Sequence, residues 1–388
     1  MIDYSKVLSK TVVDTPKSGI RRFFDLMSNM TDVVGLTVGE PDFQTPWHIR
    51  EAGIISLEKG KTYYTANAGL IDLRSQIDSY MTRRFNISYR SDSEIIVTVG
   101  GSEAIDIAFR SIIEPGDEVI IPTPSFVCYA PLVTIAGGTP IILETEFEYK
   151  FKINPEKLKA TITPRTKMLV LPYPNNPTGA IMTKDELEDI AQLLRNTNII
   201  VLSDEIYAEM TYTGSHCSIA SLDGMWERTI IASGFSKAYA MTGWRLGYIC
   251  APKTLCEQML KIHQYGIMSS PTTAQFAAIE ALQNGDEDIR MMVDEYNRRR
   301  RYIFNGLRSI GIESFEPEGA FYIFPKINSF GLSSEEFCNK LLYDYKCAIV
   351  PGNAFGNSGE GFARISYAYS IKHITQALER IEAFVKSL

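Results

Sequence analysis

Short apolar runs alternate with amphipathic segments through the middle of the chain, and this alternation limits the possible folds more than any other feature. The predicted strands occupy residues 94–99, 118–121, 139–143, 167–171, 199–203 and 228–232. Helical patterns separate some of them, for example at 102–113 and 184–195. Such alternation is typical of a mostly parallel sheet that helices cover on both faces. The sequence therefore predicts an α/β protein, in which ligands bind beyond the carboxyl ends of the strands.

The C-terminal part has a different order of predicted helices and strands. A helical pattern over about 274–310 leads to an apolar segment at 319–324. A helix at 334–345, strands at 348–350 and 362–368 and a final helix follow. This order predicts a small α+β lobe. The first 45 residues or so have weak periodicity and several turn signals, so we group them with this lobe.

The length of 388 residues allows two domains. We expect a large domain over 46–280 and a small domain formed by 1–45 together with 281–388. No internal repeat divides the chain further.

Composition excludes several classes of function. The formal net charge of −7 argues against broad nucleic-acid binding. The N-terminus lacks the order of a signal peptide, and no apolar run approaches the roughly 20 residues of a membrane span. The six cysteines form no CxxC and no zinc spacing, which fits a reducing cytoplasm without a metal site. We therefore expect a cytoplasmic protein with no nucleic-acid, membrane or metal partner.

A lysine follows the predicted strand 228–232. Partial desolvation at a strand end would lower the pKa of Lys237 and make its amine nucleophilic. Ser233, Ser236 and Arg245 offer the hydroxyls and the guanidinium that suit a phosphate dianion. A nucleophilic lysine beside a phosphate site is what pyridoxal phosphate requires. From these residues alone, a solvated surface Lys/Arg pair stays open as the alternative.

Two glycines stand where the strand at 94–99 gives way to a helix. The N–H groups of Gly101, Ser102 and Glu103, together with the positive end of the helix, would form an anion site. This pattern is weak by itself, because many α/β proteins have a glycine at such a turn. It is not GxGxxG, and no acidic residue stands at the ribose spacing, so a dinucleotide is disfavoured.

Three further positions carry polar groups where a ligand could use them. The turn around Asn176 is fixed by prolines and a glycine, so its amide would suit a phenolate oxygen, or it serves the turn alone. Asp204 ends a buried strand, where a cationic ring nitrogen would compensate it and Tyr207 could reach the same ligand. A helix N-cap is the alternative for Asp204. Arg364 lies in an apolar strand and needs a partner, either a substrate carboxylate or a structural ion pair.

In this order and spacing the motifs resemble the class I/II aminotransferases, which are pyridoxal-phosphate enzymes of fold type I. The resemblance covers nearly the whole chain, and the ordered set of motifs is highly specific. It includes Gly39-Glu40-Pro41-Asp42-Phe43, Tyr63-Tyr64-Thr65, the Asn176 turn, Asp204 with Tyr207, Ser236-Lys237 with Arg245, and Arg364. The family fold implies a mostly parallel seven-stranded sheet in the large domain and a smaller α+β domain.

Within the family, the chain is most similar to the bacterial aspartate/aromatic branch. Three segments resemble bacterial N-acetyl-diaminopimelate aminotransferases: Ser18-Gly19-Ile20-Arg21, Leu171-Pro172-Tyr173-Pro174 and His263-Gln264-Tyr265.

The resemblance implies a role for each matching residue around pyridoxal 5'-phosphate. Lys237 would bind the cofactor as a Schiff base and shuttle a proton, and Asp204 would keep the ring nitrogen protonated. Asn176 and Tyr207 would bond the phenolate oxygen, and Phe126 would stack on the ring. The catalytic residues would be Lys237, Asp204 and Tyr207.

Phosphate and substrate contacts follow from the same resemblance. The phosphate would be bound by Gly101, Ser102, the Glu103 backbone, Ser236 and Arg245. Tyr64 would reach the phosphate of the neighbouring subunit, which implies a homodimer with shared active sites. The substrate α-carboxylate would be held by Arg364, with Gly39 and Asn176 nearby.

The implied reaction transfers the α-amino group of an amino acid to a 2-oxo acid such as 2-oxoglutarate. The donor would be of the aspartate, aromatic or acyl-diaminopimelate type. Some aspartate-preferring relatives have a lysine where this chain has Ser102, so the donor stays open. We expect Arg21 or Arg22 and the loop at 269–270 to choose the side chain.

Two rivals share the fold. A pyridoxal-phosphate C–S β-lyase has the same lysine, but the Met-Thr-Gly-Trp-Arg segment at 241–245 favours an aminotransferase. The sensor domain of a transcription regulator would follow a DNA-binding domain. Only about 20 residues precede the family match, which is too short for a winged helix.

Overall fold

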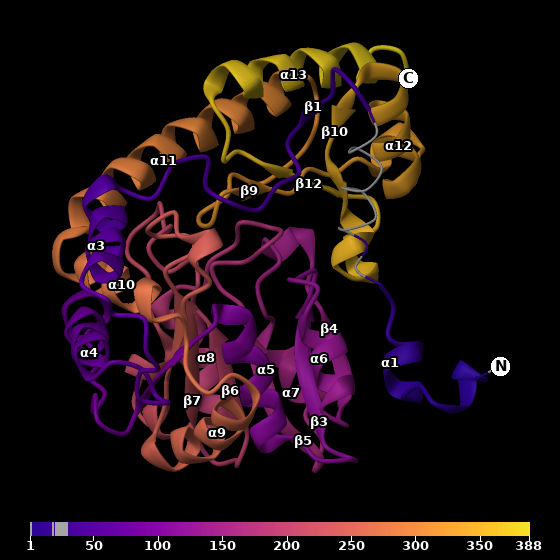
Figure 1. Cartoon of the computed structure of the whole chain (residues 1–388). Helices are drawn as coiled ribbons and strands as arrows, with labels where there is room; N and C mark the ends of the chain where they lie inside the picture. The colour runs from indigo at the N-terminus through magenta and orange to yellow at the C-terminus, as the bar shows by residue number, and fades with distance from the viewer. Residues whose placement is uncertain (1, 18, 20–29) are drawn as a thin grey trace.

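In residues 2–17, 19 and 30–388, the part of the chain that the computed structural model describes, seven strands form the largest sheet (Figure 1). Their order across the sheet is β2-β8-β7-β6-β5-β3-β4. The strands are β2 (Ile95–Thr98), β3 (Glu118–Thr123), β4 (Thr139–Glu144), β5 (Thr166–Leu171), β6 (Ile200–Asp204), β7 (Thr229–Gly234) and β8 (Gly247–Cys250). Among these strands, β8 runs in the direction opposite to the other six. The predicted mostly parallel α/β sheet is therefore confirmed.

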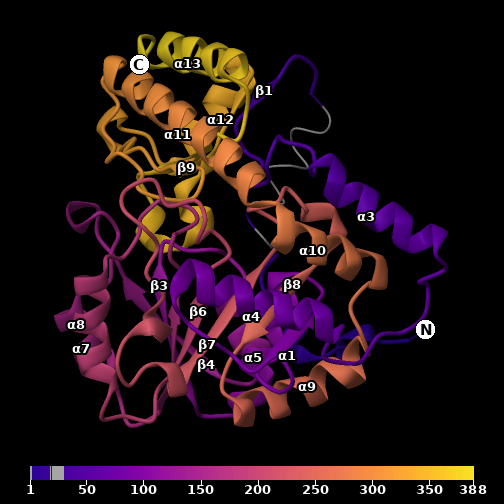
Figure 2. The same ribbon diagram turned by 90° about the vertical axis from the view of Figure 1, so that its left-hand side faces the viewer.

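Helices cover both faces of this sheet because successive side chains of a strand point in opposite directions. Val119 and Ile121 of β3 pack with one group of helices, whereas Ile120 between them packs with the other. The first group consists of α5 (Gly101–Ile112), α6 (Tyr129–Ile135) and α9 (Lys253–Gly266). The opposite face is covered by α4 (Ile71–Phe85), α7 (Pro155–Thr161), α8 (Lys184–Leu194) and α10 (Thr272–Asn284). Against α10 lies α3 (Trp47–Glu58), as Figure 2 shows.

Two small sheets and three long helices lie at one end of the large sheet (Figure 1). The parallel pair is β1 (Val34–Gly35) with β10 (Cys347–Ala348), and the antiparallel sheet has the order β11 (Val350–Pro351), β12 (Ala363–Ser366), β9 (Tyr322–Ile323). The helices are α11 (Asp286–Ser309), α12 (Ser334–Tyr345) and α13 (Ile371–Val385). The short helix α1 (Lys10–Asp14) lies near α6. Pairing of β1 with β10 brings N-terminal residues to the C-terminal part, whereas the domain boundaries 46–280 and 1–45 plus 281–388 stay a prediction.

The expected helix over 274–310 is in fact two helices. The first helix, α10, ends at Asn284, and Gly285 separates it from the second helix. A Cβ added to Gly285 would lie 2.5 Å from the carbonyl oxygen of Ala281 and 2.8 Å from the Tyr239 ring. The new helix, α11, begins with three acidic residues, which suit the positive end of a helix. The predicted strand at 348–350 is likewise divided between β10 and β11.

In the described ranges no helix is long and apolar enough to cross a membrane. The carboxyl ends of β2, β5, β6 and β7 meet at the same edge of the sheet, because these strands are parallel to one another. This edge is the place where the α/β arrangement predicts a ligand site.

Candidate active site

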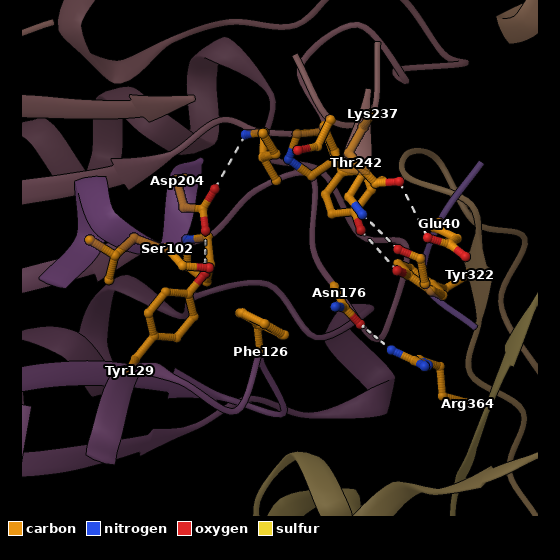
Figure 3. Close-up of a pocket in the computed structure, with 18 of the residues that line it drawn as sticks. Glu40, Ser102, Phe126, Tyr129, Asn176, Asp204, Lys237, Thr242, Tyr322 and Arg364 are labelled. Atoms are coloured by element: carbon orange, nitrogen blue, oxygen red, sulfur yellow. Dashed lines mark hydrogen bonds between the residues drawn. The ribbon is translucent and has the colours of Figure 1, made fainter. Parts of the chain in front are cut away.

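A cavity of about 340 Å³ opens at this edge, and residues of the small sheets close its other side (Figure 3). Its walls combine chain segments that lie far apart in the sequence. Most of the predicted site residues line it: Gly39, Gly101, Ser102, Phe126, Asn176, Asp204, Tyr207, Ser236, Lys237, Arg245 and Arg364. A volume of this size falls in the range of small-molecule sites.

Lys237 follows β7 and projects its amine into the cavity. Its Nζ donates a hydrogen bond of 2.6 Å to the backbone carbonyl of Gly39. Burial lowers the pKa of Lys237 to about 8, with Arg364 and Arg245 acting in the same direction and Glu40 opposing them. Such a pKa leaves a substantial fraction of the amine neutral near physiological pH, which is the nucleophilic and proton-accepting form.

The Asp204 carboxylate ends β6 and accepts two hydrogen bonds. Tyr129 at the start of α6 donates to Oδ2 at 2.7 Å, and the N–H of Ile206 donates to Oδ1 at 3.2 Å. Burial raises the pKa of Asp204. A cation entering the cavity would offset this penalty, since opposite charge favours an ionised carboxylate. Asp204 therefore fits a protonated ring nitrogen.

A cradle for an anion lies at the start of α5. Gly100 has a φ of 77°, and a Cβ added there would lie 2.6 Å from Nη2 of Arg245. Arg245 itself adopts a left-handed conformation (φ 55°), and its Nη1 donates 2.9 Å to the carbonyl of Thr242. Ser102 and Ser236 face the same space. A helix N-terminus, a guanidinium and two hydroxyls together suit a phosphate group.

Arg364 is buried in β12 with an incomplete set of partners. Its Nη1 donates 3.0 Å to Oδ1 of Asn176, and its Nη2 donates 2.5 Å to the carbonyl of Thr37. No hydrogen-bond acceptor meets its Nε among the described residues. Figure 3 shows the amide nitrogen of Asn176 turned away from Arg364, toward the cavity. Arg364 thus retains capacity for an entering carboxylate.

Two phenols meet between the large sheet and the small one. The hydroxyl of Tyr207 lies 2.8 Å from that of Tyr322 in β9, and burial raises the pKa of both groups. Sequence reasoning missed Tyr322, because the segment 320–324 is apolar and aromatic and nothing marks one phenol in it. Tyr129 was missed for a similar reason. The one sequence signal that could have identified Tyr129 is its spacing of three residues from Phe126.

Some predicted residues lie away from the cavity walls. Tyr64 is 78% exposed and belongs to no wall of this cavity. The side chain of Glu103 turns to His263, whose Nδ1 is 2.6 Å from Oε1; its predicted contact was through the backbone. Ser233 donates 3.3 Å to the carbonyl of Glu205 instead of facing the cavity.

The loop at 269–270, one of the expected side-chain selectors, does not line the cavity either. Ser270 is buried, and its hydroxyl donates 3.0 Å to the carbonyl of Val97. The predictions for Arg21 and Arg22 concern residues outside the described part of the chain.

Comparisons with known proteins agree with this geometry. The family model described as aminotransferase class I and II matches residues 31–381. The chain is 52% identical to the putative aminotransferase YugH of Bacillus subtilis, over 97% of this chain and 98% of the relative. It is 44% identical to the probable N-acetyl-LL-diaminopimelate aminotransferase of the same species, over 95% and 93%. The crystal structure of the aromatic aminotransferase from Pyrococcus horikoshii matches with a TM-score of 0.90 and 42% identity, over 95% and 99%.

These matches support amino-group transfer and give no support to the C–S lyase alternative. They cover almost the full length of the chain, including every segment that lines the cavity. The chain therefore belongs to the class I and II aminotransferase family and is an enzyme that transfers amino groups.

Proposed function

We propose that this aminotransferase uses pyridoxal 5'-phosphate, held in the cavity at the carboxyl edge of the large sheet. The observation that carries the proposal is the combination of three features of different chemistry. Asp204 is a buried carboxylate with a raised pKa, Gly100 and Arg245 form an anion cradle, and Lys237 is an amine with a lowered pKa. The ring nitrogen of the cofactor would pair with Asp204, its phosphate would occupy the anion cradle, and its aldehyde carbon would react with Lys237. When bound, the cofactor supplies an electron sink for the substrate α-carbon.

Lys237 would perform two tasks with one atom. Its Nζ would bind the cofactor covalently in the resting enzyme. Once the substrate amine has replaced it, the freed Nζ would take a proton from the substrate α-carbon and deliver it to C4′ of the cofactor. With a pKa of about 8, Nζ can both accept and release a proton near neutral pH.

Four side chains would orient the ring. Asp204 would pair with the ring nitrogen, and Tyr129 would hold that carboxylate in place through its hydrogen bond. The amide nitrogen of Asn176 and the hydroxyl of Tyr207 would donate to the phenolate oxygen. Phe126, half-buried in the cavity wall, would contribute a stacking surface. These groups are fixed before ligand binding, so little reorganisation is needed at the moment of reaction.

The phosphate would be bound by N–H groups of Gly101, Ser102 and Glu103 at the start of α5, with Ser236 and Arg245 completing the contacts. The α-carboxylate of the substrate would meet Arg364, beside Asn176 and the backbone of Gly39. Arg364 has both the free donor and the planar geometry for this.

The amino donor would be a dicarboxylic or aromatic amino acid or an acylated diaminopimelate, with 2-oxoglutarate as the acceptor. Relatives with N-acetyl-diaminopimelate and aromatic names support this range. The walls of the cavity contain three cations, Lys237, Arg245 and Arg364, within the described residues, and each already has a proposed partner. Arg21 or Arg22 stays the predicted partner of a second carboxylate of the substrate, and both lie outside the described part of the chain.

The active unit would be a homodimer in the cytoplasm. The phenol of Tyr64 is 78% exposed, and α3 and the loop after it expose Trp47, Ile54, Leu57 and Tyr63. Contiguous apolar exposure of this kind is typical of an interface. Burial of this face by a second copy would bring Tyr64 to the partner's phosphate. All six cysteines are free, which suits a reducing compartment.

A panel of amino donors and 2-oxo acids tests the proposal. The absorbance of the bound cofactor should change on addition of a true donor and be restored by 2-oxoglutarate. Lys237→Ala is the matched control, because it keeps the phosphate cradle but lacks the amine. Steady production of pyruvate and ammonia from cysteine, without transfer to any 2-oxo acid, would contradict amino transfer as the main reaction.

A further inference from the structure

Tyr322 is fully buried (0% exposed) and still reaches the cavity wall from β9. Its two ends contact different functional groups. The hydroxyl lies 2.8 Å from that of Tyr207, and the ring faces the guanidinium of Arg364 at 4.6 Å from the ring centroid. One side chain of the small sheet therefore contacts both the carboxylate-binding arginine and the tyrosine assigned to the cofactor.

The hydroxyl of Tyr322 has little freedom to turn away from Tyr207. The backbone of Gly39 closes the adjacent side, since a Cβ added at Gly39 would lie 2.5 Å from the Tyr322 oxygen. If Tyr207 donates its single proton to the cofactor, Tyr322 is the donor in the hydrogen bond between the phenols, and this bond fixes the position of the Tyr207 oxygen. The charged groups facing this phenol pair are Arg364, Asp204 and Lys237.

The ring of Tyr322 holds Arg364 from one side. Phe355 contributes a second ring, 4.8 Å from the same guanidinium carbon. Strand pairing supports this arrangement, because Tyr322 lies opposite Ser366 in the register of β9 and β12, two residues beyond Arg364. A buried guanidinium between two rings keeps its plane fixed, which matters for a bidentate carboxylate contact.

We propose that Tyr322 is a positioning residue with two separable tasks: its ring fixes Arg364 for the substrate carboxylate, and its hydroxyl fixes the Tyr207 hydroxyl for the cofactor. This inference rests on the proposed function of the cavity. Tyr322 would therefore influence both the binding of the substrate carboxylate and the electronic state of the cofactor.

Two substitutions separate the tasks. Tyr322→Phe keeps the ring and removes the hydroxyl. It should leave the dissociation constants of succinate and 3-phenylpropionate, two carboxylates without an amino group, within about twofold of wild type. It should, however, shift the pH at which the absorbance band of the bound cofactor changes. Tyr322→Leu removes the ring as well and should weaken both carboxylates about tenfold.

Two controls make the result specific. Tyr367 is another buried tyrosine, and its hydroxyl donates a 3.1 Å hydrogen bond to the carbonyl of Ala320, away from the cavity. Tyr367→Phe removes this hydroxyl and should change neither the carboxylate dissociation constants nor the absorbance transition. In Tyr207→Phe, the added change Tyr322→Phe should have no further effect on the absorbance transition, because the shared hydrogen bond is already gone. Thermal unfolding of each variant identifies any loss of folding.

An unchanged absorbance transition in Tyr322→Phe would overturn the hydroxyl task. Equal weakening of carboxylate binding in Tyr322→Phe and Tyr322→Leu would overturn the ring task. If wild-type protein takes up no cofactor at all, the proposed function itself fails, and this outcome is separate from either of the others.

Discussion

The hydroxyl of Tyr129 donates a 2.7 Å hydrogen bond to the carboxylate of Asp204, and both side chains are buried. Burial holds the pKa of Tyr129 well above its usual range, with the Asp204 charge adding to the effect, so the phenol stays neutral. Tyr129 can therefore orient Asp204 but cannot neutralise it. Lys237 compensates this charge only in part, since burial still raises the pKa of Asp204, and a cationic ring nitrogen entering the cavity would compensate it further.

Substitution of Asp204 should abolish most of the activity with little effect on the fold. We expect Asp204→Asn and Asp204→Ala to lose about 100-fold or more in kcat, because the carboxylate acts when charge develops on the ring. Tyr129→Phe should lose roughly tenfold, the usual effect of one hydrogen bond to a charged group. Steady-state kinetics and thermal unfolding measure both effects. A folded Asp204→Ala variant with near-normal turnover would show that this role is misassigned.

The amine of Lys237 should react in a pH-dependent way. Its pKa is lowered by burial to about 8, so the neutral and reactive fraction increases as the pH rises through that value. Cofactor-free protein mixed with pyridoxal phosphate should therefore form its absorbance band with a rate that is half-maximal near pH 8. A rate that keeps rising up to pH 10, without levelling off above pH 8, would indicate an ordinary exposed lysine.

The site of attachment gives an independent test of Lys237. Borohydride treatment of the loaded protein should remove the visible band, and mass spectrometry should find the pyridoxyl group on this lysine. Lys237→Ala should still take up the cofactor through the phosphate cradle but lose nearly all turnover. Label on another lysine would contradict the assignment.

Replacement of Arg364 by lysine should weaken all substrates together. The charge remains, but the planar fork that matches a carboxylate is lost, together with the contacts to Asn176 and Thr37. We expect KM for amino acids and 2-oxo acids to rise roughly tenfold or more, with little change in their ranking. A variant that loses only one class of side chain would place selectivity, not carboxylate binding, at this arginine.

The charged residues of the site could be predicted from the sequence, whereas two of its phenols, Tyr129 and Tyr322, could not. Lys237 and Asp204 stand at the ends of apolar strands, and Arg364 lies inside one, so each raises the question of what compensates its charge. Tyr129 and Tyr322 raise no such question, because a buried tyrosine is an ordinary core residue. Their roles depend on distances of 2.7 and 2.8 Å between segments that only the tertiary structure brings together.

The same limit applies to the fold. Six strands of the large sheet were predicted from apolar runs, but the four-residue strand β8 was not, since Gly247–Cys250 directly follows the irregular Lys237 segment. The break between α10 and α11 was missed although Asn284-Gly285-Asp286 is a turn signal between two helical patterns. The structure adds a steric requirement for glycine at this position, because a Cβ on Gly285 would lie 2.8 Å from the Tyr239 ring.

Shared active sites can be tested by mixing two damaged subunits. Lys237→Ala lacks the amine in its own cavity, and Tyr64→Phe weakens only the cavity of its partner if Tyr64 crosses the interface. In a mixed dimer, the cavity that keeps Lys237 then also receives an intact Tyr64. Random exchange of equal amounts makes about half of the dimers mixed, each with one intact site, so about a quarter of all sites should regain full activity.

The control for this experiment replaces Tyr64→Phe by the double variant Lys237→Ala/Tyr64→Phe, which offers no intact site in any combination. Light scattering before and after mixing should give the mass of a dimer for every sample. Activity equal to the sum of the separate variants would show that Tyr64 acts within its own subunit or not at all. A fully active monomer would exclude the shared site, because the 78% exposed phenol would then have no partner cavity to complete.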